Sequence, residues 1–223
     1  MHFEVLVEDQ SGKEALDILI PKIIGSHHSF KVRAFKGIGH IPRNLTSGVS
    51  VQNRLLLNNL PRMLSAYGKT FGNSPANVSA AVIVVCDLDD KCLKVFRQEL
   101  FRVLNACNPG PVTRFCIAIE EGEAWLLGDI PAIKTAYPNA RDNVLNGYTN
   151  DAICGTWELL ADALFQGGVT GLKRKGWRAV GREKSIWATR IAPNMNVEVN
   201  KSPSFRYFRQ KIQELMGYSG ANT

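Results

Sequence analysis

The sequence contains no apolar stretch as long as a bilayer-spanning helix, which argues against an integral membrane protein. Its five cysteines, at positions 86, 92, 107, 116 and 154, include no C-x-x-C pair and are odd in number. This pattern favours reduced thiols over a disulfide framework or a zinc site. The chain opens on an apolar, strand-like run with no basic, cleavable leader, so we expect a cytoplasmic protein without membrane contacts.

Repeats and low-complexity segments are also lacking, and the composition is that of a globular chain. The 223 residues are 45% hydrophobic and 21% charged, enough for one large domain with a substantial core. The net charge is +7, and basic residues concentrate between positions 173 and 190, whereas acidic residues cluster at 87–90 and 120–123. A basic surface beside an acidic pocket suits a metal-dependent enzyme acting on a polyanion. A solvated basic surface without any ligand is the alternative.

Short, β-branched apolar runs alternate with segments of helical periodicity through the first 137 residues. The uniformly apolar run at residues 80–86 is typical of a central strand covered on both faces. This order predicts an α/β fold with a mainly parallel sheet flanked by helices. The predicted strands are residues 3–7, 30–35, 80–86 and 112–119. The predicted helices are residues 13–24, kinked or restarted at Pro21, then 51–67, a segment ending near 104, and 121–136.

The remainder of the chain carries no strong strand signal and is rich in Gly and basic residues. Helical patterns cover residues 155–165, 181–192 and 203–216, and we expect loops rich in Gly and basic residues to join them. We therefore predict two parts: an α/β core at residues 1–137, and a C-terminal helical, basic extension at residues 138–223 that packs on the core.

Three of the predicted strands end in an acidic residue: Glu8, Asp87 and Glu120. The carboxyl ends of parallel strands meet at one edge of a sheet, where α/β proteins bind ligands. Carboxylates that converge there repel one another unless a cation neutralises them. Asp89 lies two residues after Asp87 and would project to the same side of an extended segment. These oxygen ligands favour Mg²⁺ or Mn²⁺ as the cofactor.

Each acidic segment also has a purely structural interpretation. Asp89 would lie near the start of a helix, where acidic side chains are favoured without any function. The same holds for Glu121 and Glu123, and spacing alone does not tell which glutamate of that segment faces a metal. We take Glu120 and Glu123 as its candidate ligands. Glu8 could instead be an exposed residue in a plain strand-to-helix connection.

Several segments resemble a known family. A strand ending in Glu (FEVLVEDQSGKEAL) and a hydrophobic strand ending in DxD (VIVVCDLDD) resemble the Toprim domain, whose fold is Rossmann-like. That domain is shared by type IA and II topoisomerases, bacterial primases and OLD-family nucleases. The VEDQSG, IAIEEGEAWLLGD and SPSFRYF segments are more specifically similar to a Toprim-like domain-of-unknown-function family related to the OLD nucleases. The resemblance covers residues Glu4 to Asp129, with weaker support to Phe208.

The resemblance implies a Mg²⁺-dependent nuclease that hydrolyses phosphodiesters of DNA or RNA, in a setting of bacterial defence or mobile elements. Glu8 would be the Toprim glutamate, and Asp87 with Asp89 would be the DxD pair. The Glu120–Glu123 segment would supply the further acid that OLD-like members use for a second metal, and we take Glu123 as its catalytic residue. These acids are the expected catalytic residues, together with Lys184 as a cation near the scissile phosphate.

Two departures from the family pattern stand out. The Toprim glutamate is commonly followed by Gly, whereas here Asp9 takes that place, and Ser11 is the residue expected to cap the following helix. OLD proteins usually carry an ATPase domain, but this chain has no G-x-x-x-x-G-K-[ST] sequence. Any ATPase would therefore be a separately encoded partner.

A basic strip with one aromatic residue is the candidate nucleic-acid interface. Basic side chains would contact the phosphate backbone, and Trp177 would stack on bases. Trp177 could equally be a core residue, and Lys184 could be an ordinary surface lysine. The strip consists of Lys173, Arg174, Lys175, Trp177 and Arg178.

Two other functions compete with a nuclease. One is a non-catalytic Toprim-like module that binds nucleic acid or a partner ATPase. The other is a different Mg²⁺ enzyme on an α/β sheet, such as a phosphohydrolase, although the basic segment argues against a small substrate.

Overall fold

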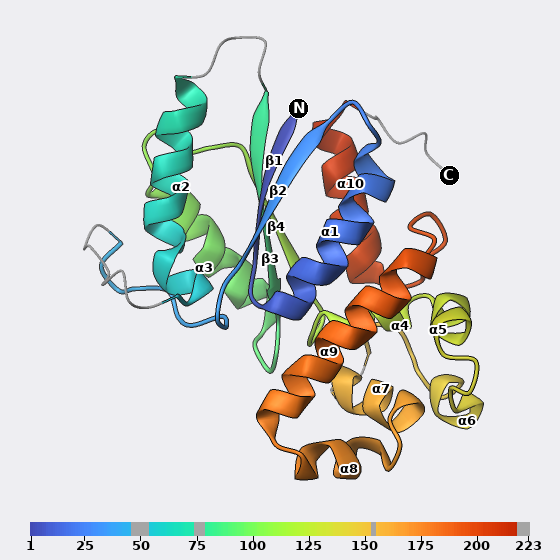
Figure 1. Cartoon of the computed structure of the whole chain (residues 1–223). Coiled ribbons are helices and arrows are strands. Elements are labelled where there is room, and N and C mark those ends of the chain that lie inside the picture. Colours follow the sequence, from blue (N-terminus) through green and yellow to red (C-terminus); the bar gives the residue numbers. More distant parts are fainter. Residues whose placement is uncertain (46–53, 74–78, 153–154, 218–223) are drawn as a thin grey trace.

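A four-stranded sheet forms the centre of the computed structural model, which describes residues 1–45, 54–73, 79–152 and 155–217 (Figure 1). The strands are β1 (His2–Val7), β2 (Ser29–Ala34), β3 (Ala80–Asp87) and β4 (Thr113–Ala118). The helices of the α/β core are α1 (Gln10–Ile24), α2 (Leu56–Gly72), α3 (Leu93–Asn105), α4 (Glu123–Leu127) and α5 (Ile130–Ala136). The later elements are α6 (Asp142–Leu145), α7 (Thr156–Leu164), α8 (Gly168–Arg174), α9 (Trp177–Ile191), the 3₁₀ turn Ala192–Asn194 and α10 (Pro203–Leu215).

The strand order is β2-β1-β3-β4, and each neighbouring pair is parallel. Parallel neighbours require helical crossovers, which α1, α2 and α3 supply in turn. The predicted mainly parallel α/β fold is therefore confirmed. Because all strands point the same way, their carboxyl ends lie at one edge of the sheet, where α4, α7 and α9 gather (Figure 1).

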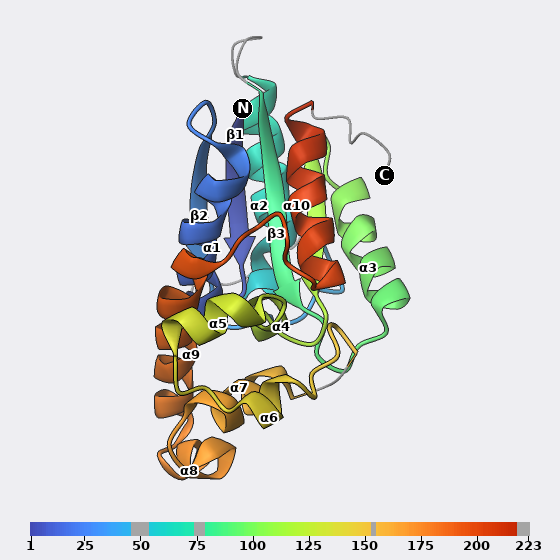
Figure 2. The ribbon, with the colours of Figure 1, turned by 90° about the vertical axis from the view of Figure 1, so that its right-hand side faces the viewer.

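Side chains alternate between the two faces of the sheet and build two apolar cores. On one face Val5 and Ile83 join the core that includes α1, α9 and α10, seen from that side in Figure 2. On the other face Leu6 and Val84 pack with α2 and α3. The strand β3 is thus covered on both faces, as its unbroken apolar sequence predicted.

The C-terminal segment completes the first of these cores. The helix α9 packs along α1, and α10 packs against β4, so both contribute buried residues such as Trp187 and Phe205. The predicted helical extension packed on the sheet is present, but it shares one continuous core with residues of the first part. In the described part of the chain, none of the helices has both the length and the apolarity of a bilayer span.

Several local expectations differ from the structure. The helix α1 continues through Pro21 as one helix, with the missing N–H confined to its last turn. The Gly- and Lys-rich stretch before residue 175, expected as a loop, forms the short helix α8. The helix expected at residues 51–67 begins outside the described residues. Cys154 also lies outside them. Cys86 and Cys116 are buried in the sheet as free thiols.

The contact between α2 and the loop before β4 gives a first testable prediction. A Cβ atom on Gly68 would lie 1.9 Å from the carbonyl oxygen of Pro109, so Gly68→Ala forces the backbone apart. We expect it to lower the free energy of unfolding by about 1–3 kcal/mol. Gly72→Ala, on the same helix with nothing within 4 Å, is the matched control and should be neutral or stabilising. Equal destabilisation of both variants in urea titrations would contradict the packing described.

Candidate functional site

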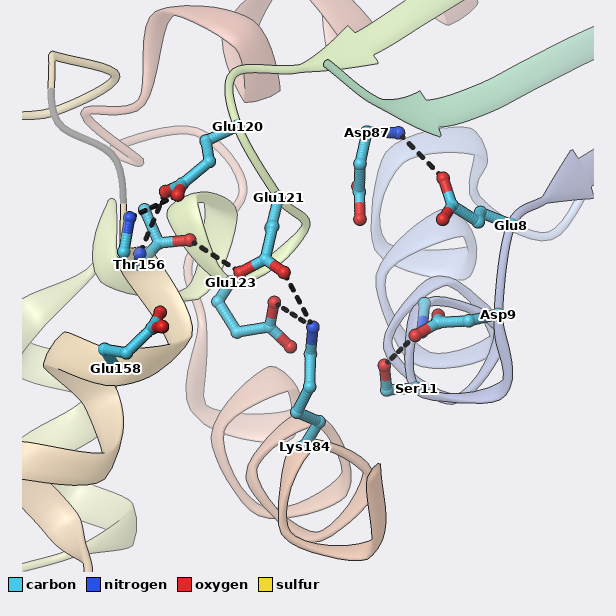
Figure 3. Close-up of polar contacts among 12 residues, drawn as sticks. Glu8, Asp9, Ser11, Asp87, Glu120, Glu121, Glu123, Thr156, Glu158 and Lys184 are labelled. Atoms are coloured by element: carbon cyan, nitrogen blue, oxygen red, sulfur yellow. Dashed lines mark hydrogen bonds and ion pairs between the residues drawn. The ribbon is translucent and has the colours of Figure 1, made fainter. Parts of the chain in front are cut away.

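Glu8 and Asp87 come together at the carboxyl edge of the sheet. Glu8 follows β1 directly, and Asp87 is the last residue of the neighbouring strand β3. The backbone N–H of Asp87 donates a hydrogen bond to Oε2 of Glu8 at 3.3 Å. The two carboxylates lie side by side in Figure 3. The sequence argument from strand ends therefore placed this pair correctly.

The electrostatics of this pair are unfavourable without a counter-charge. Burial raises the pKa of Glu8 to about 7, and the neighbouring charges of Asp89 and Asp9 act in the same direction. The pKa of Asp87 is raised well above its ordinary range, first by burial and then by the charge of Glu8. Two adjacent, partly buried acids that both resist ionisation form a site that would gain from a cation.

A second pair of carboxylates lies opposite the first, with Lys184 between them (Figure 3). Nζ of Lys184, on α9, lies 3.3 Å from Oε1 of Glu121 and 3.1 Å from Oε2 of Glu123. Glu123 is the first residue of α4 and its side chain is almost fully buried. Lys184 keeps only 14% of its side chain exposed. The lysine is therefore a buried member of the site.

Burial dominates the ionisation of this second group as well. It raises the pKa of Glu121 to about 7 and also raises the pKa of Glu123, although the charge of Lys184 acts against both shifts. The pKa of Lys184 moves upward: burial lowers it, but the charges of Glu123, Glu121 and Asp87 together outweigh that effect. Lys184 is consequently a permanent cation among acids that outnumber it.

Asp9 has a structural role next to the site. Its carboxylate accepts hydrogen bonds from the backbone N–H of Gly12 at 2.7 Å and from Oγ of Ser11 at 2.7 Å. Asp9 is thus the N-cap of α1, and the prediction that Ser11 caps this helix is wrong. The cap is needed because the strand turns into the helix within two residues of Glu8. An acid at position 9 therefore has a local structural reason.

Asp89 does not continue the extended segment that ends at Asp87, although its charge still acts on Glu8. The strand β3 ends at Asp87, and the backbone of Asp89 has a φ of 50°, so the two residues are not part of one extended segment. The Asp89 side chain is 42% exposed and pairs with Lys91 at 2.6 Å. The expectation that both aspartates project to one side fails because the chain turns immediately after the strand.

Glu120 also points elsewhere. Its backbone has a φ of 63°, and its carboxylate accepts hydrogen bonds from the backbone N–H groups of Gly155 and Thr156, the latter at 2.9 Å. These groups form the start of α7, where a carboxylate stabilises unpaired N–H donors. Glu120 is therefore placed as a cap, whereas Glu121, which the sequence left unassigned, faces Lys184.

The donor set at this edge limits which ion it could hold. In the described part of the chain, no three His, Cys, Asp or Glu side chains are arranged to hold a metal ion together. Mg²⁺, however, is commonly bound by one or two carboxylates with water and substrate phosphates completing its coordination. Glu8 and Asp87 fit that smaller demand, because they are adjacent and partly buried, and the charge of Glu8 raises the pKa of Asp87.

A small cavity of about 40 Å³ adjoins these carboxylates. It is lined by Glu8, Asp87 and Glu123 and by apolar residues where α1, α4 and α9 meet. This volume admits a water molecule or an ion, but no nucleotide. A large substrate would therefore meet the carboxylates from outside, at the edge of the sheet.

The comparison with protein families gives one match, to the family described as Domain of unknown function (DUF4276), over residues 7–213. The chain belongs to the DUF4276 family. No curated protein and no solved structure matches the chain significantly. The matched segment includes Glu8, Asp87, Glu121, Glu123 and Lys184. In this DUF4276 chain, then, the family match covers most of the α/β core, most of the helical extension and every residue of the carboxylate cluster.

The basic strip of this DUF4276 chain lies on α8 and the start of α9, and all of its side chains are exposed. Lys173 pairs with Glu158 at 3.3 Å and lies over the ring of Trp157. Lys175 lies 4.8 Å from the centroid of the Phe165 ring. Trp177 is on the surface, so it is not the core residue that the sequence allowed as an alternative.

Proposed function

We propose that this protein is a Mg²⁺- or Mn²⁺-dependent nuclease of the Toprim-like type. The observation that carries the proposal is the convergence of Glu8, Asp87 and the Lys184-bound glutamates at the carboxyl edge of a parallel sheet. That edge is where α/β proteins bind ligands. Adjacent, partly buried acids with raised pKa values, beside a largely buried lysine, form the kind of site that catalytic chemistry requires.

In this proposal Glu8 and Asp87 hold the ion, which when bound would polarise a phosphoryl oxygen and lower the pKa of a bound water. Lys184 would donate hydrogen bonds to a phosphate oxygen on which negative charge develops during hydrolysis. Glu121 and Glu123 hold the ammonium group of Lys184 in place through ion pairs of 3.3 and 3.1 Å. The two glutamates are therefore positioning residues for the lysine.

A polyanionic substrate accounts for the charge distribution of the chain. The net charge is +7, four acids lie at the carboxylate cluster, and α8 and the start of α9 carry several exposed basic side chains. Such an arrangement attracts a phosphodiester chain to the surface and presents one phosphate to the acidic edge. The proposal leaves DNA and RNA as equal candidates, with a separately encoded ATPase as a possible partner.

A non-catalytic module that binds nucleic acid is the second candidate, and one observation favours it. Lys184 already neutralises part of the charge of Glu121 and Glu123 without a metal ion. A site satisfied in this way could serve binding alone, and such a module would show salt-sensitive affinity with no cleavage.

The test is a cleavage assay on plasmid DNA, single-stranded DNA and RNA with Mg²⁺ or Mn²⁺. We expect cleavage by the wild type, and Asp87→Asn to lower its rate at least about a hundredfold. Asp142→Asn, an exposed aspartate that pairs with Lys134, is the matched control and should retain the wild-type rate. Equal cleavage by wild type and Asp87→Asn would refute the site, and binding without any cleavage would favour the second candidate.

A further inference from the structure

Trp177 is an exposed tryptophan in a protein that buries its others. Its relative exposure is 76%, whereas Trp125, Trp157 and Trp187 are each less than 8% exposed. An indole ring in water leaves a large apolar area without packing contacts. An exposed tryptophan therefore indicates a binding surface. Trp177 is the first residue of α9, the helix that carries Lys184.

The indole ring of Trp177 packs against the indole ring of Trp157. The rings of Trp157 and Trp177 meet edge to face, with centroids 6.1 Å apart and an interplanar angle of 63°. Nζ of Lys173 lies 5.1 Å from the centroid of the Trp157 ring on the same small surface. Trp157 thus supports the exposed ring, which reduces the entropy that Trp177 would lose on binding a flat partner.

The surface around Trp177 is basic. Among the described residues, no ion pair neutralises the Arg174, Lys175, Arg178 or Arg182 side chains, and only Lys173 has a close acidic partner, Glu158. Aromatic faces surrounded by unpaired cations are typical of surfaces that bind single-stranded nucleic acid. A protein partner would also accept an exposed tryptophan, but interfaces between proteins are depleted in clustered lysines.

This surface is continuous with the carboxylate cluster. Trp157 follows Thr156, whose Oγ1 hydrogen-bonds to Oε2 of Glu121 at 3.5 Å. Lys184 lies seven residues after Trp177 on α9, which is about two turns and roughly 10 Å along the axis, on the same face of the helix. A base stacked on Trp177 would therefore place its own backbone within a few nucleotides of the Lys184 ammonium.

We propose that Trp177, supported by Trp157, stacks on an unpaired nucleobase, and that the substrate is therefore a single-stranded polynucleotide or an unpaired region of a duplex. The word substrate in this inference rests on the proposed nuclease function. The binding experiment that tests the stacking does not depend on that function. A paired base in a duplex presents only its edges in the grooves, so Trp177 cannot stack on it without opening the pair.

The test measures binding of the full chain to fluorescein-labelled oligo(dT), oligo(rU) and a hairpin duplex of equal length, in EDTA and at low salt. Stacking contributes enough per base that Trp177→Ala should weaken single-strand binding by about 10- to 100-fold. Duplex binding, which depends on the cations, should change less than about twofold. Trp177→Phe should keep most of the single-strand affinity, and Val199→Ala, another exposed apolar residue, should change nothing.

Because the assay contains no metal and no cleavage, its outcome is independent of the nuclease proposal. If Trp177→Ala lost affinity for duplex and single strand by the same factor, the stacking role would be overturned. Unchanged affinity for both ligands would overturn it as well. Wild-type protein that binds neither oligonucleotide at low salt would also overturn it and point to a protein partner. Asp142→Asn, at an exposed aspartate outside the carboxylate cluster, should bind single strands like the wild type, and a failed cleavage assay leaves this result standing.

Discussion

Lys184→Met is expected to lower the free energy of unfolding by about 3 kcal/mol at pH 8, because it leaves the buried acids Glu121 and Glu123 without their cation. The cost should be much smaller at pH 5. Burial already raises the pKa of both glutamates, and the variant removes the opposing charge of Lys184, so they become protonated as the pH falls. Lysine itself stays charged over this range, so the pH dependence comes from the glutamates.

Urea titrations at pH 5 and pH 8 would measure this effect. Adding Glu123→Gln to Lys184→Met should restore part of the stability at pH 8, since it removes one of the two stranded charges. Lys173→Met is the matched control: its ion pair with Glu158 is exposed, and its loss should cost less than about 1 kcal/mol. A Lys184→Met cost that is equal at the two pH values would contradict the buried ion-pair cluster.

Glu8→Gln should have the opposite effect and stabilise the metal-free protein at pH 8 by about 3 kcal/mol. The pKa of Glu8 is raised to about 7 by burial, and one pKa unit corresponds to about 1.4 kcal/mol. A raised pKa in the folded state means that the protonated acid contributes stability at low pH, and that this contribution is lost as the pH rises through 7. The amide has no such loss and can still accept the hydrogen bond from Asp87.

The stabilisation by Glu8→Gln should therefore vanish near pH 4, where the wild-type acid is protonated in both states. Guanidinium titrations with EDTA at pH 4 and pH 8 would measure it. Glu198→Gln, at an exposed glutamate, is the control and should be neutral at both. Destabilisation by Glu8→Gln at pH 8 would mean that the Glu8 carboxylate is favourable in the metal-free protein, contrary to our description.

The order of strands and helices could be predicted because the signals are local. Residues 80–86 are β-branched and apolar throughout, and they become the strand covered by helices on both faces. Glu8 and Asp87 could be placed together because parallel strands align their carboxyl ends. Both inferences need only the periodicity of the sequence and the direction of the strands.

The remaining site residues depend on features that residue types do not reveal. Asp89 and Glu120 each adopt a positive φ, so the chain turns at both residues and neither continues its strand. The residue types Asp and Glu do not predict such a backbone conformation. The pairing of Glu121 with Lys184 joins residues 63 positions apart and depends on how α9 packs along α1. The helix α8 was missed because its glycines and lysines resemble a loop.

Mn²⁺ binding at pH 8, followed by electron paramagnetic resonance of the free ion, tests the proposed metal site most directly. If Glu8 and Asp87 hold the ion, the wild type binds Mn²⁺, and Glu8→Gln and Asp87→Asn each weaken that binding at least about tenfold. Asp142→Asn should bind like the wild type. Mn²⁺ binding of the same affinity and stoichiometry in the wild type and both site variants would contradict the account.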